Sequence, residues 1–180
     1  EGGSVLMMAS RYSNTESTEE TVKMLLEHSK IDVNLQDDEG WTALMMASRY
    51  SNTESTEGTV KMLLENHEID VNLQNKVCWT ALILASRHSN NDSTEGTVKM
   101  LLEHSKIDVN LQDDEGWVAL MMASRYSNNE STEGTVKMLL KHPKIDVNLQ
   151  DKEGWTALML ASRYSNNEST EGTVKMLLKH

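Results

Sequence analysis

The side chains that could bind a metal ion or attack a substrate recur along this chain at a spacing that disfavours both activities. His28, His104, His142 and His180 fall at the same point of a repeated segment. Equivalent groups in stacked repeats lie about 10 Å apart, the packing distance of helices, which is too wide for one tetrahedral metal ion. The single cysteine, Cys78, has no histidine or aspartate partner at a recognisable spacing. We therefore expect no metal, no cofactor and no catalytic residue, with these histidines at the surface or at helix ends.

The acidic and glycine residues also lack the spacing of a known site. The runs at 37–39 and 113–115, both Asp-Asp-Glu, do not alternate their oxygen ligands as a calcium loop does, so we expect solvated turn tips. No glycines have the spacing of a phosphate-binding loop. Catalysis requires dissimilar groups that converge in one pocket, whereas a repeat places similar groups in parallel rows. The sequence therefore predicts a protein that is not an enzyme.

A different row of side chains is suited to binding another protein. Each copy from the second onwards contains a tryptophan that is followed, eight and nine residues later, by an arginine and a tyrosine or histidine. Tryptophan, tyrosine and arginine are the residue types most enriched among binding hot spots. We call this set the tryptophan–arginine row; it comprises Trp41, Arg49, Tyr50, Trp79, Arg87, His88, Trp117, Arg125, Tyr126, Trp155, Arg163 and Tyr164.

The positions of the row follow from an internal repeat. The four tryptophans lie 38 residues apart, and segments 41–78 and 117–154 differ at only nine of their 38 positions. A period in this range is typical of stacked small units, none of which can bury its apolar face alone. We expect one array over 1–180, an excerpt of a longer one because the last copy is partial and no initiator methionine is present. Its repeats are expected at 3–40, 41–78, 79–116, 117–154 and, in part, 155–180.

Composition limits the partners and the compartment. The formal net charge is −11 and the pI about 4.9, which disfavours a surface that neutralises phosphates, so we expect no nucleic-acid binding. The acidity serves solubility or, alternatively, attracts a basic partner. No apolar run is long enough to cross a bilayer, and we expect no membrane segment. The single cysteine is compatible with a reducing compartment, which indicates an intracellular location, cytoplasmic or nuclear.

A short first helix is predicted in each copy. In the second copy, residues 42–50 contain no glycine or proline, and Leu44 and Ala47 lie on one helical face. Thr42 is expected near the start of this helix. The polar residues 51–55 then form a connection of turn formers.

A second helix follows the polar connection. Its start is expected at Ser55, whose hydroxyl would cap the helix, and residues 17–20 (Ser-Thr-Glu-Glu) in the first copy match a full capping box. Val60, Leu63 and Leu64 form its apolar face. The unit therefore contains two helices that can pack against their equivalents in the next copy.

An extended loop connects one repeat to the next. Residues 69–73 alternate apolar and polar side chains as a strand does, but the run is short and flanked by turn formers. We expect a loop instead, with Ile69 and Val71 placed under the helices. Residues 113–116 form a turn in which Gly116 can supply a positive φ.

The order of these residues resembles the ankyrin repeat. The resemblance implies an all-α solenoid of helix–loop–helix units with extended, hairpin-like loops. In that family, the residue after the turn glycine and the pair that ends the first helix face the concave groove in which partners dock. The tryptophan–arginine row is then expected to line this groove. The resemblance rests on Gly40-Trp41-Thr42-Ala43-Leu44, Ala47-Ser48, Val60-Lys61-Met62-Leu63-Leu64 and Asp70-Val71-Asn72, and it recurs over essentially the whole chain.

A structural interpretation of the row stays open beside the groove. Each tryptophan could pack along its hairpin and brace the next repeat, with the arginine stacked on it, and both interpretations can hold at once.

Several positions depart from the family pattern. The usual repeat has about 33 residues, so copies of 38 residues are a long variant, with the additional residues mainly at 51–55. The family's Thr-Pro-Leu-His is Thr-Ala-Leu-Met at 42–45, which removes the histidine hydrogen bonds between repeats, and we expect methionine packing to replace them. Val118 replaces the threonine that starts the first helix in other copies. Cys78 replaces the turn glycine, which calls that hairpin into question.

The sequence as a whole predicts a non-catalytic scaffold that binds a partner protein through a concave groove and the hairpin tips. One alternative is a structural spacer or an array that self-associates end to end. Another is the targeting arm of an enzyme or ubiquitin-ligase adaptor encoded outside this segment. The near-identity of the copies indicates either a recent duplication or a target that is itself repetitive or extended.

Overall fold

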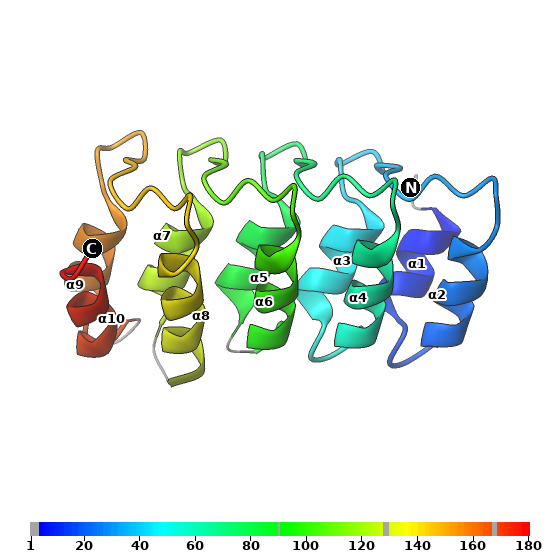
Figure 1. The fold of residues 1–180 in the computed structure, drawn as a ribbon, viewed down its shortest axis with the longest axis horizontal. Helices are drawn as coiled ribbons and strands as arrows, with labels where there is room; N and C mark the ends of the chain where they lie inside the picture. Colours follow the sequence, from blue (N-terminus) through cyan, green and yellow to red (C-terminus); the bar gives the residue numbers. More distant parts are fainter. Residues whose placement is uncertain (1–3, 90, 128–129, 167–168) are drawn as a thin grey trace.

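The protein is an array of paired helices. The computed structural model describes residues 4–180 except 90, 128–129 and 167–168. These described residues form ten helices and no strand, as expected for the predicted all-α fold (Figure 1). The first helices of the units are α1 (Val5–Arg11), α3 (Ala43–Tyr50), α5 (Ala81–His88), α7 (Ala119–Arg125) and α9 (Ala157–Arg163). The second helices are α2 (Glu19–Leu26), α4 (Glu57–Glu65), α6 (Glu95–Glu103), α8 (Glu130–Leu140) and α10 (Glu171–Leu177).

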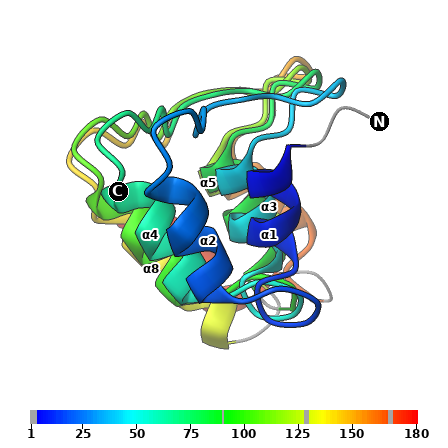
Figure 2. The same cartoon turned by 90° about the vertical axis from the view of Figure 1, so that its right-hand side faces the viewer.

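The helices lie in two layers. First helices pack beside first helices and second helices beside second helices, and each first helix also packs on the second helix of its own unit (Figures 1 and 2). The loops that join successive units project as hairpins on the side of the first helices (Figure 2). One side of the array therefore combines first helices with hairpins, and the other consists of second helices.

The first helices begin as the sequence predicts. The hydroxyl of Thr42 accepts a hydrogen bond from the backbone N–H of Met45 at 3.2 Å, and Thr80 does the same for Ile83 at 3.1 Å. Val118 stands at the same position of α7 and gives it no side-chain cap. The helix forms without it because Leu120 and its neighbours are buried on both sides by α5 and α9.

The second helices other than α8 begin one residue later than predicted. Thr56, rather than Ser55, caps α4 by accepting the N–H of Thr59 at 3.0 Å. Ser55 is buried and donates instead to the carbonyl of Ser10 in the preceding unit, at 2.6 Å. The predicted capping box in the first copy is also wrong, because Thr18 rather than Ser17 is the cap of α2. The sequence pattern predicts that Ser55 caps its own helix, whereas in the structure its hydroxyl bonds to the preceding unit.

The predicted core faces are confirmed. Val60 and Leu63 of α4 have no exposed surface, and Leu64 is half-buried beside them. In the following loop, Ile69 and Val71 are 3% and 2% exposed, so this segment lies under the helices and forms no strand. The same positions are buried from unit to unit, and together they make one continuous apolar core.

The hairpin that contains Cys78 forms despite the missing glycine. Gly40 and Gly116 have φ of +79° and +85°, and Cys78 adopts φ +58° at the equivalent position. A Cβ at Gly116 would lie 2.9 Å from the Cα of Asp151 in the next hairpin, so glycine allows close approach there. After Cys78 the corresponding hydrogen bond, from Asp114 N to Val77 O, is 3.3 Å long, against 3.0 Å for its equivalents in the neighbouring hairpins.

The predicted methionine packing is found at Met45, Met121 and Met122, which are buried, but not at the exposed Met159, and polar contacts between units accompany it. The hydroxyl of Thr59 donates to that of Ser13 at 2.7 Å, and the hydroxyl of Thr97 donates to that of Ser51 at 2.6 Å. All four side chains are buried. Of the twelve methionines, those fully buried are Met7, Met45, Met121 and Met122, whereas Met8, Met24 and Met159 are exposed.

Two further series of side chains connect the loops. Asn34 donates to the carbonyl of Glu68 at 2.7 Å and accepts the N–H of Asp70 at 2.8 Å, and the contacts recur at Asn72 and Asn110. Gln36, Gln74 and Gln112 each donate to a carbonyl of their own hairpin and to one in the next. Because every unit supplies the same amide at the same place, the loops are fixed in register with the helices.

Candidate functional site

The tryptophan–arginine row lies where hairpins meet first helices. Each tryptophan ends a hairpin, and each arginine lies in the last turn of a first helix. All four tryptophans are half-buried. The guanidinium carbon of each arginine lies over the tryptophan ring of its own unit: Arg49 over Trp41 at 6.0 Å, Arg87 over Trp79 at 5.5 Å, Arg125 over Trp117 at 5.6 Å and Arg163 over Trp155 at 5.0 Å.

The arginines also stack on the tyrosine of the following unit. The first unit adds Arg11 and Tyr12 to the series, although it has no tryptophan at the equivalent position. Such contacts bring a cation over the negative face of a ring and are stronger where water is partly excluded. The interpretation of the row as packing between repeats therefore has direct geometric support. The pairs across a boundary are Arg11 with Tyr50 at 4.6 Å, Arg87 with Tyr126 at 4.9 Å and Arg125 with Tyr164 at 4.4 Å.

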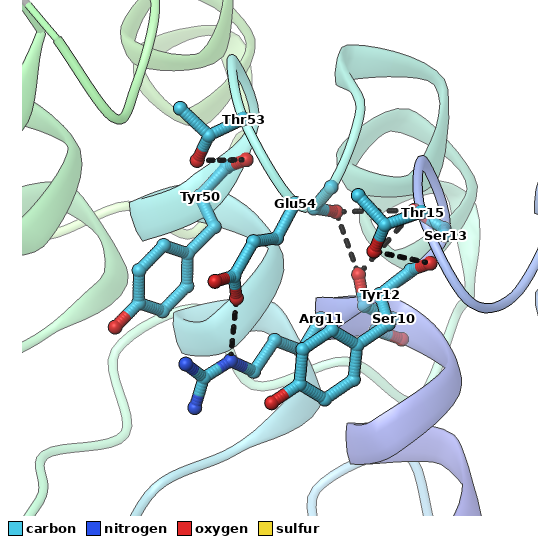
Figure 3. A network of polar contacts seen from close by, with 9 residues as sticks. Ser10, Arg11, Tyr12, Ser13, Thr15, Tyr50, Thr53 and Glu54 are labelled. Atoms are coloured by element: carbon cyan, nitrogen blue, oxygen red, sulfur yellow. Dashed lines mark hydrogen bonds and ion pairs between the residues drawn. The ribbon is translucent and has the colours of Figure 1, made fainter.

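The boundary between the first two units has an additional ion pair. The Nε of Arg11 donates to the carboxylate of Glu54 at 2.8 Å, and both side chains are about one-third exposed. Figure 3 shows the guanidinium between the rings of Tyr12 and Tyr50, with Glu54 above it. The charge of this arginine is thus shared between a carboxylate and two rings of adjacent units.

The series is interrupted at His88. This residue replaces the tyrosine on which Arg49 would otherwise stack, and its side chain is 14% exposed. Burial lowers the pKa of His88 to about 4; the charges of Arg49 and Arg87 act in the same direction, and Asp92 opposes them. Its Nδ1 lies 3.7 Å from the carboxylate of Asp92. The Nε of Arg49 and the Nε2 of His88 are both buried without a hydrogen-bond partner in the described part of the chain.

Clefts open between units along the row. The larger has a volume of about 190 Å³ and lies between the hairpin at 151–155 and helices α7 and α9. Trp117, Trp155 and Arg125 line it together with carboxylates from two hairpins, Glu115 and Glu153. Each cleft thus presents ring faces, a guanidinium and carboxylates to a ligand. A second cleft, one unit earlier, is lined by Arg87, Asp113, Glu115, Trp117, Met122, Arg125 and Tyr126.

The chain matches a known family over its whole length. The family model described as ankyrin repeats (3 copies) matches residues 1–75, 54–151 and 90–180. The chain belongs to the ankyrin-repeat family. Proteins of this ankyrin family typically bind other proteins and are usually non-catalytic, and the matches include no catalytic domain. A search of curated proteins finds no match to the array.

The remaining candidate residues of the ankyrin array have structural positions. The carboxylate of Asp37 accepts the backbone N–H groups of Glu39 and Trp41 at 2.9 and 2.8 Å, so it closes the turn, while Asp38 and Glu39 are exposed at the tip as predicted. The described residues contain no group of three His, Cys, Asp or Glu side chains that could hold a metal ion. In the same residues, no helix has the length and apolar character needed to span a membrane.

The predicted positions of the repeated histidines are confirmed. His28 is exposed just beyond α2, and His104 is the C-cap of α6. His142 and His180 lie in the same place after α8 and α10.

Sequence reasoning missed the serine, asparagine and glutamine contacts between units. Their signal was present in the 38-residue period, because a polar side chain that recurs in register meets its own equivalent in the next unit. The carboxylates of the clefts were missed for a different reason. Glu115 and Glu153 belong to the hairpin tips in the sequence, and only the fold brings them to the arginines of α7 and α9.

Proposed function

We propose that this ankyrin array, a long variant with 38-residue repeats, is a non-catalytic scaffold that binds an extended segment of a partner protein along the tryptophan–arginine row and the hairpin tips. The observation that carries the proposal is the pair of clefts on either side of Trp117. Both are lined by tryptophan, arginine and tyrosine, the side chains that contribute most to protein binding. The arginines are already held by stacking, so little side-chain entropy is lost when a partner docks.

The spacing of the clefts supports an extended partner. Equivalent helices pack about 10 Å apart, which matches the advance of roughly three residues of extended chain. A partner that places an aromatic or charged side chain at every third residue could therefore occupy successive clefts in the same way. The near-identity of the copies fits this use, because each unit would meet a similar side chain.

The test uses the position of Trp117 in both clefts. Wild-type, Trp117→Ala and Trp41→Ala arrays are used to capture partners from cells, followed by quantitative mass spectrometry and affinity measurement on each protein enriched. Trp41 occupies the same place in the second unit but lines neither of these two clefts, so Trp41→Ala should weaken binding less than Trp117→Ala. We expect Trp117→Ala to weaken binding by about tenfold or more, the effect of a hot-spot residue, with the helical CD spectrum unchanged. Equal affinities of wild-type and Trp117→Ala arrays for every captured partner would refute the proposal.

A further inference from the structure

Charge is distributed unevenly along the array. Residues 1–116 contain nine basic and 21 acidic side chains, whereas residues 117–180 contain eight basic and seven acidic ones. Part of the change arises at the ends of the second helices. The position after the last apolar pair is occupied by glutamate in the first three units and by lysine in the last two: Glu27, Glu65, Glu103, Lys141 and Lys179.

This exchange removes an ion pair from α8. In α4, Lys61 lies 3.8 Å from Glu65, one helical turn away, and α6 has the same pair at 3.9 Å between Lys99 and Glu103. The corresponding residues at α8 are Lys137 and Lys141; Lys141 is the first residue beyond the helix, and its backbone N–H still donates to the carbonyl of Lys137 at 3.3 Å. Both are exposed, and neither forms an ion pair with any described residue. Like charges at this spacing destabilise a helix on its own, so an anionic ligand at this position would relieve a repulsion.

The lysines border an apolar groove. Leu140 and Met176 form its floor between α8 and α10, and Lys137, Lys141 and Lys179 stand around it. The second helices form the layer away from the hairpins (Figure 2), and the groove is lined by residues at and just beyond the ends of two of them, α8 and α10. It is therefore distinct from the clefts of the tryptophan–arginine row.

The same groove exists between α4 and α6 with the opposite charge. Its floor is Leu64 and Met100, and its border includes Glu65 and Glu103 at the positions of the two lysines. The two grooves are lined by equivalent positions, but the α4–α6 groove is larger, about 320 Å³ against about 140 Å³, and its border carries two glutamates in place of two lysines. The array thus contains its own control.

We propose that the groove between α8 and α10 binds an acidic amphipathic peptide segment of a partner protein. Carboxylates of the segment would pair with Lys137, Lys141 and Lys179, and an apolar side chain would cover Leu140 and Met176. A peptide fits better than an anionic membrane, because a bilayer surface laid along the second helices would also meet the acidic residues of the first three units. A segment of a few residues meets only the basic end.

The experiment measures binding of a labelled twelve-residue peptide of repeating Glu-Glu-Leu-Leu by fluorescence anisotropy, with its Lys-Lys-Leu-Leu counterpart as a probe of opposite charge. Lys141→Glu with Lys179→Glu installs the residues that the first three units have naturally, so the helices are expected to form. We expect the wild-type array to prefer the acidic peptide, and the double variant to bind it about tenfold more weakly, with the difference shrinking as salt is added.

The converse variant transfers the site. Glu65→Lys with Glu103→Lys should give a second binding site for the acidic peptide, seen as a doubled stoichiometry in calorimetry. Trp117→Ala should leave peptide affinity unchanged, which separates this proposal from the proposed function. The proposal is overturned if the wild-type array and the Lys141→Glu, Lys179→Glu variant bind the acidic peptide equally. It is also overturned if Trp117→Ala abolishes binding, or if vesicles with anionic lipid compete the peptide away by occupying the same lysines.

Discussion

Segments 78–88 and 116–126 have the same fold and occupy the same place in successive units, yet their contacts differ at both ends. In the second segment, Gly116 allows the next hairpin to approach, and Tyr126 receives the guanidinium of Arg87 at 4.9 Å. In the first, Cys78 carries a Cβ at a positive φ, and His88 leaves Arg49 without a ring to stack on in the next unit. We therefore expect segment 78–88 to be the weaker of the two.

Nearly identical repeats need not be equally stable along an array. In a stack of units, the free energy of unfolding is the sum of the units and of the contacts between neighbours. The apolar core continues unchanged through both segments. The lower stability expected of 78–88 therefore comes from its polar and aromatic contacts. Each of the following variants tests one of the differences between the two segments.

The largest effect is expected from the buried leucine of each second helix. Leu101 and Leu139 have no exposed surface and belong to the units that contain the two segments. Replacing either by alanine should lower the free energy of unfolding by about 2–5 kcal/mol. Because the 78–88 region couples its neighbours more weakly, Leu101→Ala should also split urea unfolding into two steps, followed by CD and tryptophan fluorescence. Single, coincident transitions in both variants would show that the two regions couple equally. Leu102→Ala, at a half-buried position, is the control with a smaller loss.

A tyrosine at position 88 should remove the difference in arginine–tyrosine stacking between the two segments. His88→Tyr gives Arg49 a ring in the next unit, as Arg87 has in Tyr126, and we expect about 0.5–2 kcal/mol of stabilisation in urea unfolding. Tyr126→His is the matched converse and should destabilise the array by a similar amount. Unchanged stability in both variants would mean that the stacking contributes nothing to stability.

The effect of His88→Tyr should depend on pH. The pKa of His88 is lowered from 6.5 to about 4 in the folded protein, so between these values the unfolded chain binds a proton that the folded chain does not. Stability of the wild-type array should therefore fall as the pH falls from about 6.5 towards about 4, and His88→Tyr should remove that part of the loss. Melting temperatures across this range check it, and parallel curves for the two proteins would contradict the assignment.

The smallest effect is expected at the hairpin. Cys78→Gly should stabilise the array by about 0.5 kcal/mol, because relief of the left-handed strain is partly offset by the greater freedom of glycine in the unfolded chain. The cost of close approach is measured separately with Gly116→Ala and Gly154→Ala. Both glycines have positive φ, but a Cβ at Gly154 meets nothing within 4 Å, whereas one at Gly116 meets the backbone of Asp151. Gly116→Ala should therefore lower the melting temperature more than Gly154→Ala. Equal decreases in melting temperature would mean that contact between neighbouring hairpins does not contribute to stability.

Much of the fold could be predicted because a local pattern recurs in register. Thr42 at the start of α3, the buried face of α4 and the positive φ of Gly116 each depend on a few adjacent residues. The prediction was wrong where a side chain bonds to a neighbouring unit instead of capping its own helix. Ser55 has the chemistry of a helix cap, but its hydroxyl is buried against Ser10, and the next residue takes the cap.

The candidate site was predicted only as a row of residue types. The period shows that Trp41, Arg49 and Tyr50 have equivalents in each copy, but not that each arginine stacks on a ring of the next unit. That contact depends on how far one unit is translated and rotated relative to the last. The sequence likewise shows that His88 replaces a tyrosine. Only the structure shows that this histidine is largely buried and that burial and the charges of Arg49 and Arg87 lower its pKa.

The sequence by itself determined that this protein is a stack of helical pairs of the ankyrin type, because the 38-residue period repeats every apolar face and turn in register. Only the stacked structure shows which side chains come together across units: serine contacts serine, arginine stacks on the following tyrosine, and hairpin carboxylates share a cleft with the arginines of the first helices. The physical reason is that helices and turns are fixed by neighbours along the chain, whereas contacts between repeats depend on the geometry of stacking, which no single repeat contains.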